Sequence, residues 1–402
     1  MSTDTTLDFK GKGLTSIPES VYIETQATWI VLSNNYLRTI PSKISRLSNV
    51  TRLAFNDNAI HTVERGLGKL RKLSWMDFTR NRLKDLPDDL SNAIHLTGLG
   101  LSENLFEEIP ECIYYLINLR KFGCFSNKIS YISPRIAKLT KLVKMDLSNN
   151  CLKYLPDEIV ELKSLTWLNL SNNQLRELPK NLKKLSNLEE LGLGVNELRE
   201  LPDMSGLLKL RILPVFKNKL VKINNLNKCD GLEKLDVSDN NINEFPIDVL
   251  YLKNIKYFNL RGNQIKEINV ENVDTSIKSE INMIDVSDNL LSFLPVKFFL
   301  LFNHLATLRY SNNPFVVKPQ EIPKEKPTLF QLILSKFMNL KNAKRKLYPI
   351  ETYNVKKFVC DECKKIFCHD PVAVYVPSNF EDGFSFVIKK HLCSSRCSSK
   401  SL

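Results

Sequence analysis

The chain has 402 residues, of which 43% are hydrophobic and 25% charged, the composition of a globular protein with a large core. No apolar run follows Met1 and no apolar stretch is long enough to cross a membrane, so we expect neither a signal peptide nor a membrane span. The formal net charge is +13, but basic runs such as Lys344–Lys346 resemble solvated helix and loop faces, and we do not expect nucleic-acid binding.

One pattern recurs along most of the chain. In residues 165–179, Leu168 and Leu170 alternate with polar residues, Asn173 follows, and Leu175, Leu178 and Pro179 come after it. The same asparagine returns first at steps of 23 residues and then at steps of 22, 22, 23, 26 and 24. The asparagines are Asn35, Asn58, Asn81, Asn104, Asn127, Asn150, Asn173, Asn196, Asn218, Asn240, Asn263, Asn289 and Asn313.

The residue types of one repeat predict its structure. Leu168 and Leu170 alternate with polar neighbours, which indicates a short strand with one buried face. The Asn173 amide can satisfy backbone groups of the neighbouring coil that would otherwise be buried and unpaired. A single repeat cannot bury its apolar side alone, so successive repeats must stack. The sequence therefore predicts an α/β solenoid, a curved horseshoe with a parallel sheet on its concave side.

Thirteen repeats in one register resemble the leucine-rich repeat family. A degenerate copy precedes them at Leu7, Phe9 and Leu14, and we assign residues 1–316 to this solenoid. Repeats of 23 residues with Leu-Pro after the strand are similar to those of intracellular, Ras-associated signalling scaffolds. That resemblance implies a small GTPase or a phosphatase as partner.

Large side chains gather on the predicted concave face, where the residues six, four, two and one before each asparagine point. All three tryptophans of the chain lie six residues before an asparagine. Aromatics on a solvent-facing sheet are typical interface anchors, although they can also pack on one another across strands. We predict that this face binds a protein or peptide of acidic and apolar character, around a centre formed by Trp75, Lys121, Phe125, Lys144 and Trp167. The candidate residues are Trp29, Trp75, Lys121, Phe125, Lys144, Trp167, Phe216 and Tyr257.

Apparent catalytic and nucleotide motifs are explained by the repeat. Gly98–Gly100 and Gly192–Gly194 lack the third glycine of a dinucleotide-binding loop, and residues 236–240 lack the glycine and final glutamate of a calcium loop. No nucleophile–base pair stands out, so we predict no catalytic residues and no enzyme activity.

A proline-rich linker, residues 317–327, separates the repeats from a predicted amphipathic helix in residues 328–350. The helix could cap the last repeat, as the ends of solenoids require. Alternatively, its sequence resembles the elongin-binding box of cullin ubiquitin-ligase receptors, which would make the protein a substrate receptor. The matching residues are Thr328, Leu329, Ile333 and Phe337.

Two cysteine pairs lie in the last segment, residues 356–402. In a reducing compartment, Cys360 and Cys363 with Cys393 and Cys397 predict one structural zinc site, the alternative being free thiols. The arrangement resembles a zinc-knuckle module, similar to one that follows the repeats in some intracellular leucine-rich repeat proteins. Potential substitute ligands are Cys368, His369 and His391, of which His391 is the first choice.

Val372, Val374 and Val376 alternate with other residues between these pairs, and Gly383 is placed to turn the chain into residues 384–388. Together these features predict a non-catalytic scaffold in the cytoplasm, with the nucleus as a second location. It would bind a protein partner on the concave face in intracellular signalling. The competing prediction is the cullin-ligase receptor.

Overall fold

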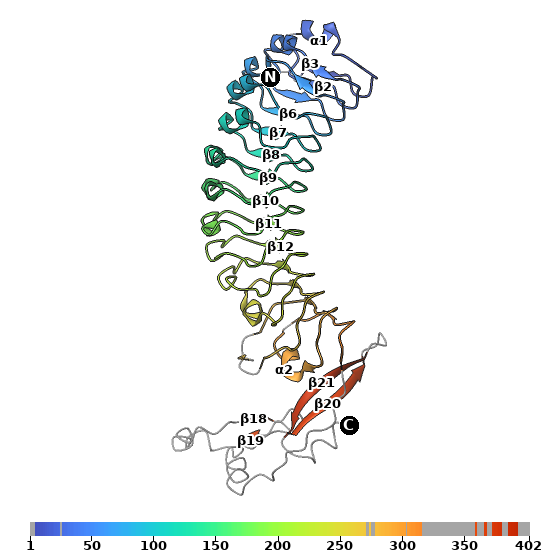
Figure 1. Ribbon diagram of the computed structural model, residues 1–402, viewed down its shortest axis with the longest axis vertical. Coiled ribbons are helices and arrows are strands. Elements are labelled where there is room, and N and C mark those ends of the chain that lie inside the picture. Colours follow the sequence, from blue (N-terminus) through green and yellow to red (C-terminus); the bar gives the residue numbers. More distant parts are fainter. Residues whose placement is uncertain are drawn as a thin grey trace. The chain divides into compact units, whose positions relative to one another are not determined.

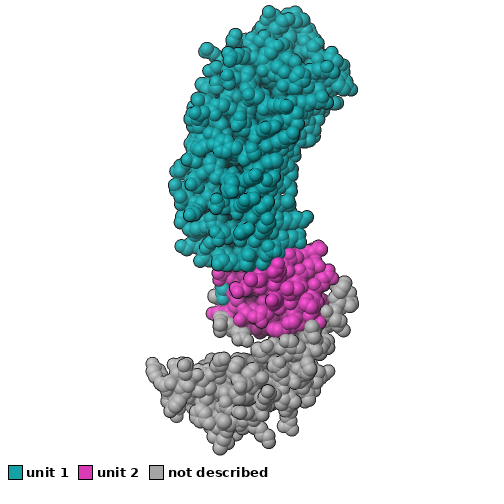
Figure 2. All heavy atoms as spheres, viewed as in Figure 1, with its two compact units in different colours: residues 1–241, 251–260 teal, residues 242–250, 261–402 magenta. Residues whose placement is uncertain are grey.

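The computed structural model describes residues 5–24, 26–270, 273–274, 278–302 and 304–315, together with the backbone of four strands within 358–392. The chain divides into two compact units. Unit 1 comprises residues 1–241 and 251–260, and unit 2 comprises residues 242–250 and 261–402 (Figure 2). No helix in the described residues has the length and hydropathy of a membrane span.

Three-residue strands, one from each repeat, form a parallel sheet of 14 strands in chain order (Figure 1). This arrangement confirms the predicted leucine-rich repeat solenoid, and β1 shows that the degenerate first copy also forms a strand. Unit 1 contributes β1 (Thr6–Asp8), β2 (Trp29–Val31), β4 (Arg52–Ala54), β6 (Trp75–Asp77), β7 (Gly98–Gly100), β8 (Lys121–Gly123), β9 (Lys144–Asp146), β10 (Trp167–Asn169), β11 (Glu190–Gly192), β12 (Ile212–Pro214), β13 (Lys234–Asp236) and β14 (Tyr257–Asn259). Unit 2 contributes β15 (Met283–Asp285) and β17 (Thr307–Arg309).

The return segments of the repeats are mostly short 3-10 helices, which commonly begin after a proline with extended backbone, as at Pro41 and Pro156. The two 22-residue repeats, between Asn196 and Asn240, have no helix. The helices of the described residues are α1 (Glu19–Ile23), η1 (Ser42–Arg46), η2 (Leu67–Lys69), η3 (Asp88–Asn92), η4 (Glu111–Tyr115), η5 (Pro134–Lys138), η6 (Asp157–Glu161), η7 (Leu182–Lys184), η8 (Ile247–Tyr251) and α2 (Val296–Phe299). A two-stranded sheet, β3 (Thr39–Ile40) with β5 (Thr62–Val63), precedes the return helices η1 and η2.

The repeating asparagine joins successive coils. Asn173 Nδ2 donates to the carbonyl oxygens of Leu147 and Leu170, both at 3.0 Å, and Oδ1 accepts from the Leu152 backbone N–H at 3.0 Å. At every repeat the Oδ1 atom accepts from a backbone N–H of the preceding coil. The amide thus meets its hydrogen-bonding capacity in the interior, as the sequence predicted.

The residue before each asparagine adopts the left-handed conformation, with φ of 53° at Asn149 and 54° at Asn172. Asn, Asp and Gly, which tolerate this region, fill most of these positions. Val195, at φ 56°, is the β-branched exception. Sequence reasoning placed this residue on the concave face but did not foresee its backbone requirement.

Unit 2 also holds the four strands of the last segment. β20 (Val372–Asn379) and β21 (Ser385–Leu392) pair antiparallel on either side of Gly383, where the sequence indicated a turn. β21 also pairs in parallel with β16 (Leu294–Pro295). β18 (Phe358–Val359) pairs antiparallel with β19 (Ile366–Phe367).

Candidate functional site

The predicted binding residues all lie in unit 1, on or next to the sheet strands. The residues five and three before each asparagine fill the core; Leu168 and Leu170, for example, are each 1% exposed. The residues six, four and two before it lie on the opposite face, which we call the concave face. The strand register aligns the first of these positions into a row across the sheet. From β2 to β11 this row reads Trp29, Arg52, Trp75, Gly98, Lys121, Lys144, Trp167 and Glu190.

The tryptophans do not stack on one another. The Arg52 guanidinium lies over the Trp29 ring, 5.7 Å from its centre. The Trp75 ring lies over Gly98, where an added Cβ would come within 2.7 Å of the indole Cδ1. Since no ring contact joins two tryptophans in the described part of the chain, cross-strand aromatic packing does not account for their presence.

Two lysines occupy the centre of the row. Lys121 and Lys144 are direct partners in the β8–β9 ladder, and both side chains are exposed. Neither forms an ion pair with a described residue. Like charges directly opposite in a sheet are destabilising, so folding alone does not favour this pair.

The nearest acidic positions in the sheet are engaged in local hydrogen bonds. Asp146 Oδ1 accepts from the Ser148 backbone N–H at 3.0 Å and from its hydroxyl at 2.7 Å. Asp77 Oδ1 accepts from the Thr79 N–H at 2.8 Å. Neither aspartate forms an ion pair with the lysines, which are exposed between two half-buried tryptophans, Trp75 and Trp167.

The other predicted aromatics are spread along the face. Phe125 follows Lys121 by four residues in the same repeat, and its backbone N–H donates to Ser102 Oγ at 3.2 Å. Phe216 lies over Gly194, where an added Cβ would meet the ring Cε1 at 2.5 Å. Tyr257 begins β14, several strands away. Trp75, Lys121, Phe125, Lys144 and Trp167 thus belong to the repeats of β6 to β10. Trp29 lies two strands before Trp75, and Phe216 and Tyr257 belong to the later repeats of β12 and β14.

Beside Trp167, the structure forms a hollow of about 250 Å³ that the sequence reasoning did not identify. Glu190 of β11 adjoins Trp167 in the row, and Gly192 at the end of the same strand leaves the floor of the hollow without a side chain. An added Cβ at Gly192 would come within 2.5 Å of Asn169 Oδ1. The available signal was the glycine in a concave position next to the last tryptophan. The lining residues are Trp167, Asn169, Ser171, Glu190, Leu191, Gly192, Ile212 and Pro214.

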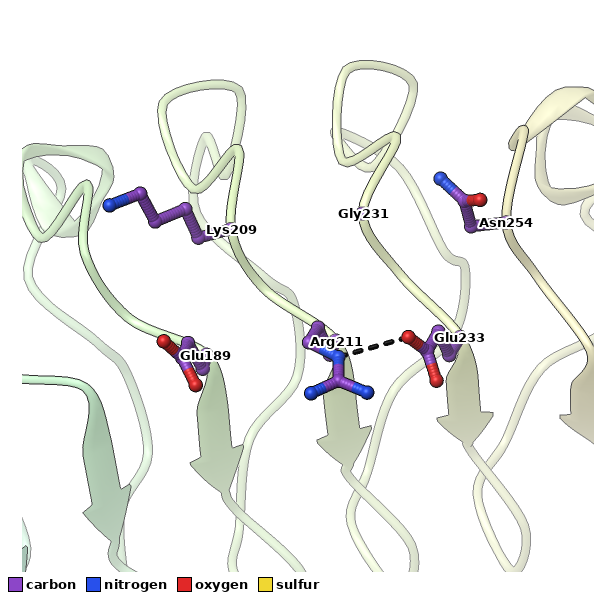
Figure 3. Close-up of a pocket in the computed structure, with 6 residues that line it drawn as sticks. All are labelled: Glu189, Lys209, Arg211, Gly231, Glu233 and Asn254. Atoms are coloured by element: carbon purple, nitrogen blue, oxygen red, sulfur yellow. Dashed lines mark hydrogen bonds and ion pairs between the residues drawn. The ribbon is translucent and has the colours of Figure 1, made fainter.

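A second hollow, of about 400 Å³, lies where the chain enters β11 to β13 (Figure 3). Glu189, Arg211 and Glu233 stand side by side there, and Arg211 Nε donates to Glu233 Oε1 at 2.9 Å. This hydrogen bond holds the pKa of Glu233 below its ordinary value. In earlier repeats the same position is often Thr or Ser; Thr97 Oγ1, for example, donates to the Ser74 carbonyl at 3.0 Å.

Three of the four described thiols are buried in the core. Burial raises the pKa of Cys112 to about 12 and that of Cys229 to about 11, and the fully buried Cys124 is raised further. These thiols are protonated at neutral pH and are poor nucleophiles.

Two predicted sites lie outside the described residues. They are the zinc ligands Cys360, Cys363, Cys393 and Cys397 with the substitutes Cys368 and His369, and the helix residues Thr328, Leu329, Ile333 and Phe337. The backbone of His391 belongs to β21. Groups of potential metal ligands are absent from the described part of the chain, which does not include those cysteines.

Comparisons with known proteins agree with the fold. The family model described as leucine rich repeat matches residues 118–175. A leucine-rich repeat protein of Leptospira interrogans has a TM-score of 0.70 and 27% identity, over 76% of this chain and 77% of that chain. An internalin of Listeria monocytogenes has a TM-score of 0.62 and 20% identity, over 78% and 82%. Toll, in the Drosophila Toll–Spätzle complex, has a TM-score of 0.69 and 21% identity, over 77% of this chain and 45% of that chain. No curated protein matches the sequence.

Proposed function

We propose that this leucine-rich repeat chain is a non-catalytic scaffold that captures a protein partner on its concave face. The binding centre is the row segment from Trp75 through Lys121 and Lys144 to Trp167, with Phe125 beside it. The observation that carries the proposal is the exposed, unpaired lysine pair between two tryptophans.

The charge of this centre selects the chemistry of the partner. Two adjacent ammonium groups attract carboxylates, and a partner that neutralises them also removes their mutual repulsion. The indole rings of Trp75 and Trp167 offer large apolar surfaces, which often dominate binding energy at interfaces. The partner segment is therefore acidic at its centre and apolar on both sides.

Affinity recovery of the tagged full chain from cell lysate, followed by mass spectrometry, tests the proposal. A parallel sample carries Lys121→Glu and Lys144→Glu, and a control carries Lys153→Glu, an exposed lysine beyond the strands. Partners of the concave face are lost with the double change and retained with the control. Recovery of the same proteins in equal amounts by all three chains would refute the proposal.

At a finer level we propose a cytoplasmic signalling role, with a small GTPase or phosphatase as partner on the strength of the repeat type. The alternative is a substrate receptor of a cullin-type ubiquitin ligase, which rests on the sequence pattern of Thr328, Leu329, Ile333 and Phe337. A Leu329→Asp chain separates them in the same recovery experiment. Loss of elongin and cullin components would favour the receptor; a retained GTPase or phosphatase without ligase components would favour the signalling scaffold.

We also propose that Cys360, Cys363, Cys393 and Cys397 hold one structural zinc ion. The antiparallel β18 and β19 pair on either side of the segment that contains Cys360 and Cys363, and β21 ends one residue before Cys393. Such strand ends commonly carry zinc-knuckle ligands. Metal analysis of the purified chain would give one equivalent, reduced by Cys360→Ser. A value far below one equivalent would refute the site.

A further inference from the structure

We propose that the hollow beside Trp167 is an arginine pocket, which receives an arginine side chain of the same partner that the lysine pair binds. The inference rests on the proposed function and adds a basic residue to the acidic, apolar segment described above. The Trp167 ring forms one wall of the pocket, and the Glu190 carboxylate supplies a negative charge. Gly192, which has no side chain, forms the floor.

The Trp167 ring and the Glu190 carboxylate together suit a guanidinium group. Glu190 is half-buried and makes no ion pair or side-chain hydrogen bond with a described residue. Its charge acts on Arg211, but that guanidinium is hydrogen-bonded to Glu233, which leaves the Glu190 oxygens open to a partner. A guanidinium can stack on an indole face and at the same time donate two hydrogen bonds to a carboxylate. The compact ammonium of lysine cannot do both equally well.

The chain itself shows the contact at the same repeat position. Arg52 lies over Trp29 at 5.7 Å in the row that also contains Trp167. Trp167 has no cation over its ring among the described residues, although Lys144 precedes it in the row and Glu190 follows it. Trp29 is covered by Arg52 of this chain, whereas the Trp167 ring can accept the arginine of a partner.

Gly192 makes the pocket possible. The next strand carries Ile212 and Pro214, which close the far side of the hollow. A side chain at position 192 would collide with Asn169 Oδ1 at 2.5 Å and would occupy the hollow. The glycine leaves the depth that a long arginine side chain needs.

The spacing within the partner follows from the sheet. Lys144 and Glu190 are two strands apart, which is about 10 Å at the usual strand separation. An extended segment that crosses the strands advances about 3.3 Å per residue. It would therefore carry its acidic residue and its arginine three positions apart.

Selection of a phage-displayed random 12-residue peptide library on the immobilised full chain tests this inference. Peptides selected on the wild-type chain should carry an acidic residue and an arginine three positions apart. A Glu190→Gln chain should select acidic, apolar peptides without the arginine. The matched control is Glu189→Gln, which changes the neighbouring glutamate outside this hollow and should leave the arginine preference intact.

Affinities of one selected peptide and its citrulline version complete the test, because citrulline keeps the shape of arginine but not its charge. Citrulline should weaken binding about tenfold on the wild-type chain and much less on Glu190→Gln, where only the contact with the Trp167 ring remains. Equal binding of both peptides to the wild-type chain, or equal losses on both chains, would overturn the pocket while leaving the lysine site standing. A library that yields no peptide sensitive to Lys121→Glu with Lys144→Glu would overturn the proposed function as well.

Discussion

The asparagine of each repeat and the residue six positions before it belong to the same coil, yet they follow different rules. At the asparagine position, the same hydrogen bond to the preceding coil recurs from Asn35 to Asn313. At the other position the chain places Trp, Arg, Gly, Lys, Glu and Ile on one surface. Both positions lie on the same periodic scaffold, so the scaffold alone does not explain the variety.

The difference separates residues required by folding from residues available for binding. A buried amide that joins two coils can be replaced only at the cost of unpaired backbone groups. A side chain on the open sheet face has no such obligation, and an unfavourable choice there, such as the Lys121–Lys144 pair, indicates another use. Four predictions test this division.

The largest effect is expected from Asn150→Ala. The change removes the donor to the Cys124 and Leu147 carbonyls and the acceptor for the Ile129 N–H. It should lower the free energy of unfolding by about 3 kcal/mol in chemical denaturation. Lys144→Ala, on the concave face of the same repeat, should change it by less than about 0.5 kcal/mol. Similar losses for both variants would contradict the division.

The lysine pair should show the opposite behaviour. Lys121→Glu with Lys144→Glu should weaken partner binding about a hundredfold, because attraction to the partner's carboxylates becomes repulsion. The unfolding transition should hardly move. Titration of the partner at two salt concentrations, with Lys153→Glu as control, measures the effect. Binding that ignores both the reversal and the salt would exclude an electrostatic role.

Val195→Asn should stabilise the fold by about 1 kcal/mol, since Asn tolerates the left-handed φ of 56° better than a β-branched residue. The reverse change, Asn172→Val, should destabilise by a similar amount at φ 54°. Thermal unfolding of both variants checks the pair of signs. No difference between them would mean that the backbone relaxes at this position.

The smallest effect concerns pH. Hydrogen bonds from Arg80 to Asp57, from Lys219 to Glu197 and from Arg211 to Glu233 lower the pKa values of these carboxyls. A carboxyl with a lowered folded-state pKa contributes stability above its ordinary pKa of about 4 and loses it as pH falls. Denaturation between pH 7 and pH 3 should therefore show a modest decline below about pH 4. Arg211→Gln should make this loss of stability at low pH smaller, because Glu233 would no longer have a lowered pKa.

The repeat made most of the fold predictable. The alternation around Leu168 and Leu170, and the spacing from Asn35 to Asn313, fixed the strands, their parallel order and the role of the asparagine. The 3-10 character of the return segments was not predictable from this pattern, because one apolar periodicity fits several tight helical conformations. The left-handed conformation of the residue before each asparagine was also not predicted. Arg80, Val195 and Lys217 occupy this position in three repeats, so its preference for Asn and Asp is not evident in the sequence.

The candidate site was predicted both by column and in its central group of residues. Counting back from the asparagine placed Trp75, Lys121 and Lys144 on the concave face, where the structure has them. The pattern could not show that Arg52 lies over Trp29, or that Gly192 leaves a hollow beside Trp167. Those relations depend on which way side chains lean across strands, and spacing along the chain does not determine this.

The most direct test of the account is affinity recovery with the two central tryptophans removed. A chain with Trp75→Ala and Trp167→Ala would be compared with one carrying Tyr131→Ala and Tyr154→Ala, two exposed aromatics beyond the asparagine turn that are 57% and 53% exposed. The account predicts that the tryptophan variant loses its partners while the tyrosine variant keeps them, with both chains folded. Undiminished recovery by the tryptophan variant would contradict binding on the concave face.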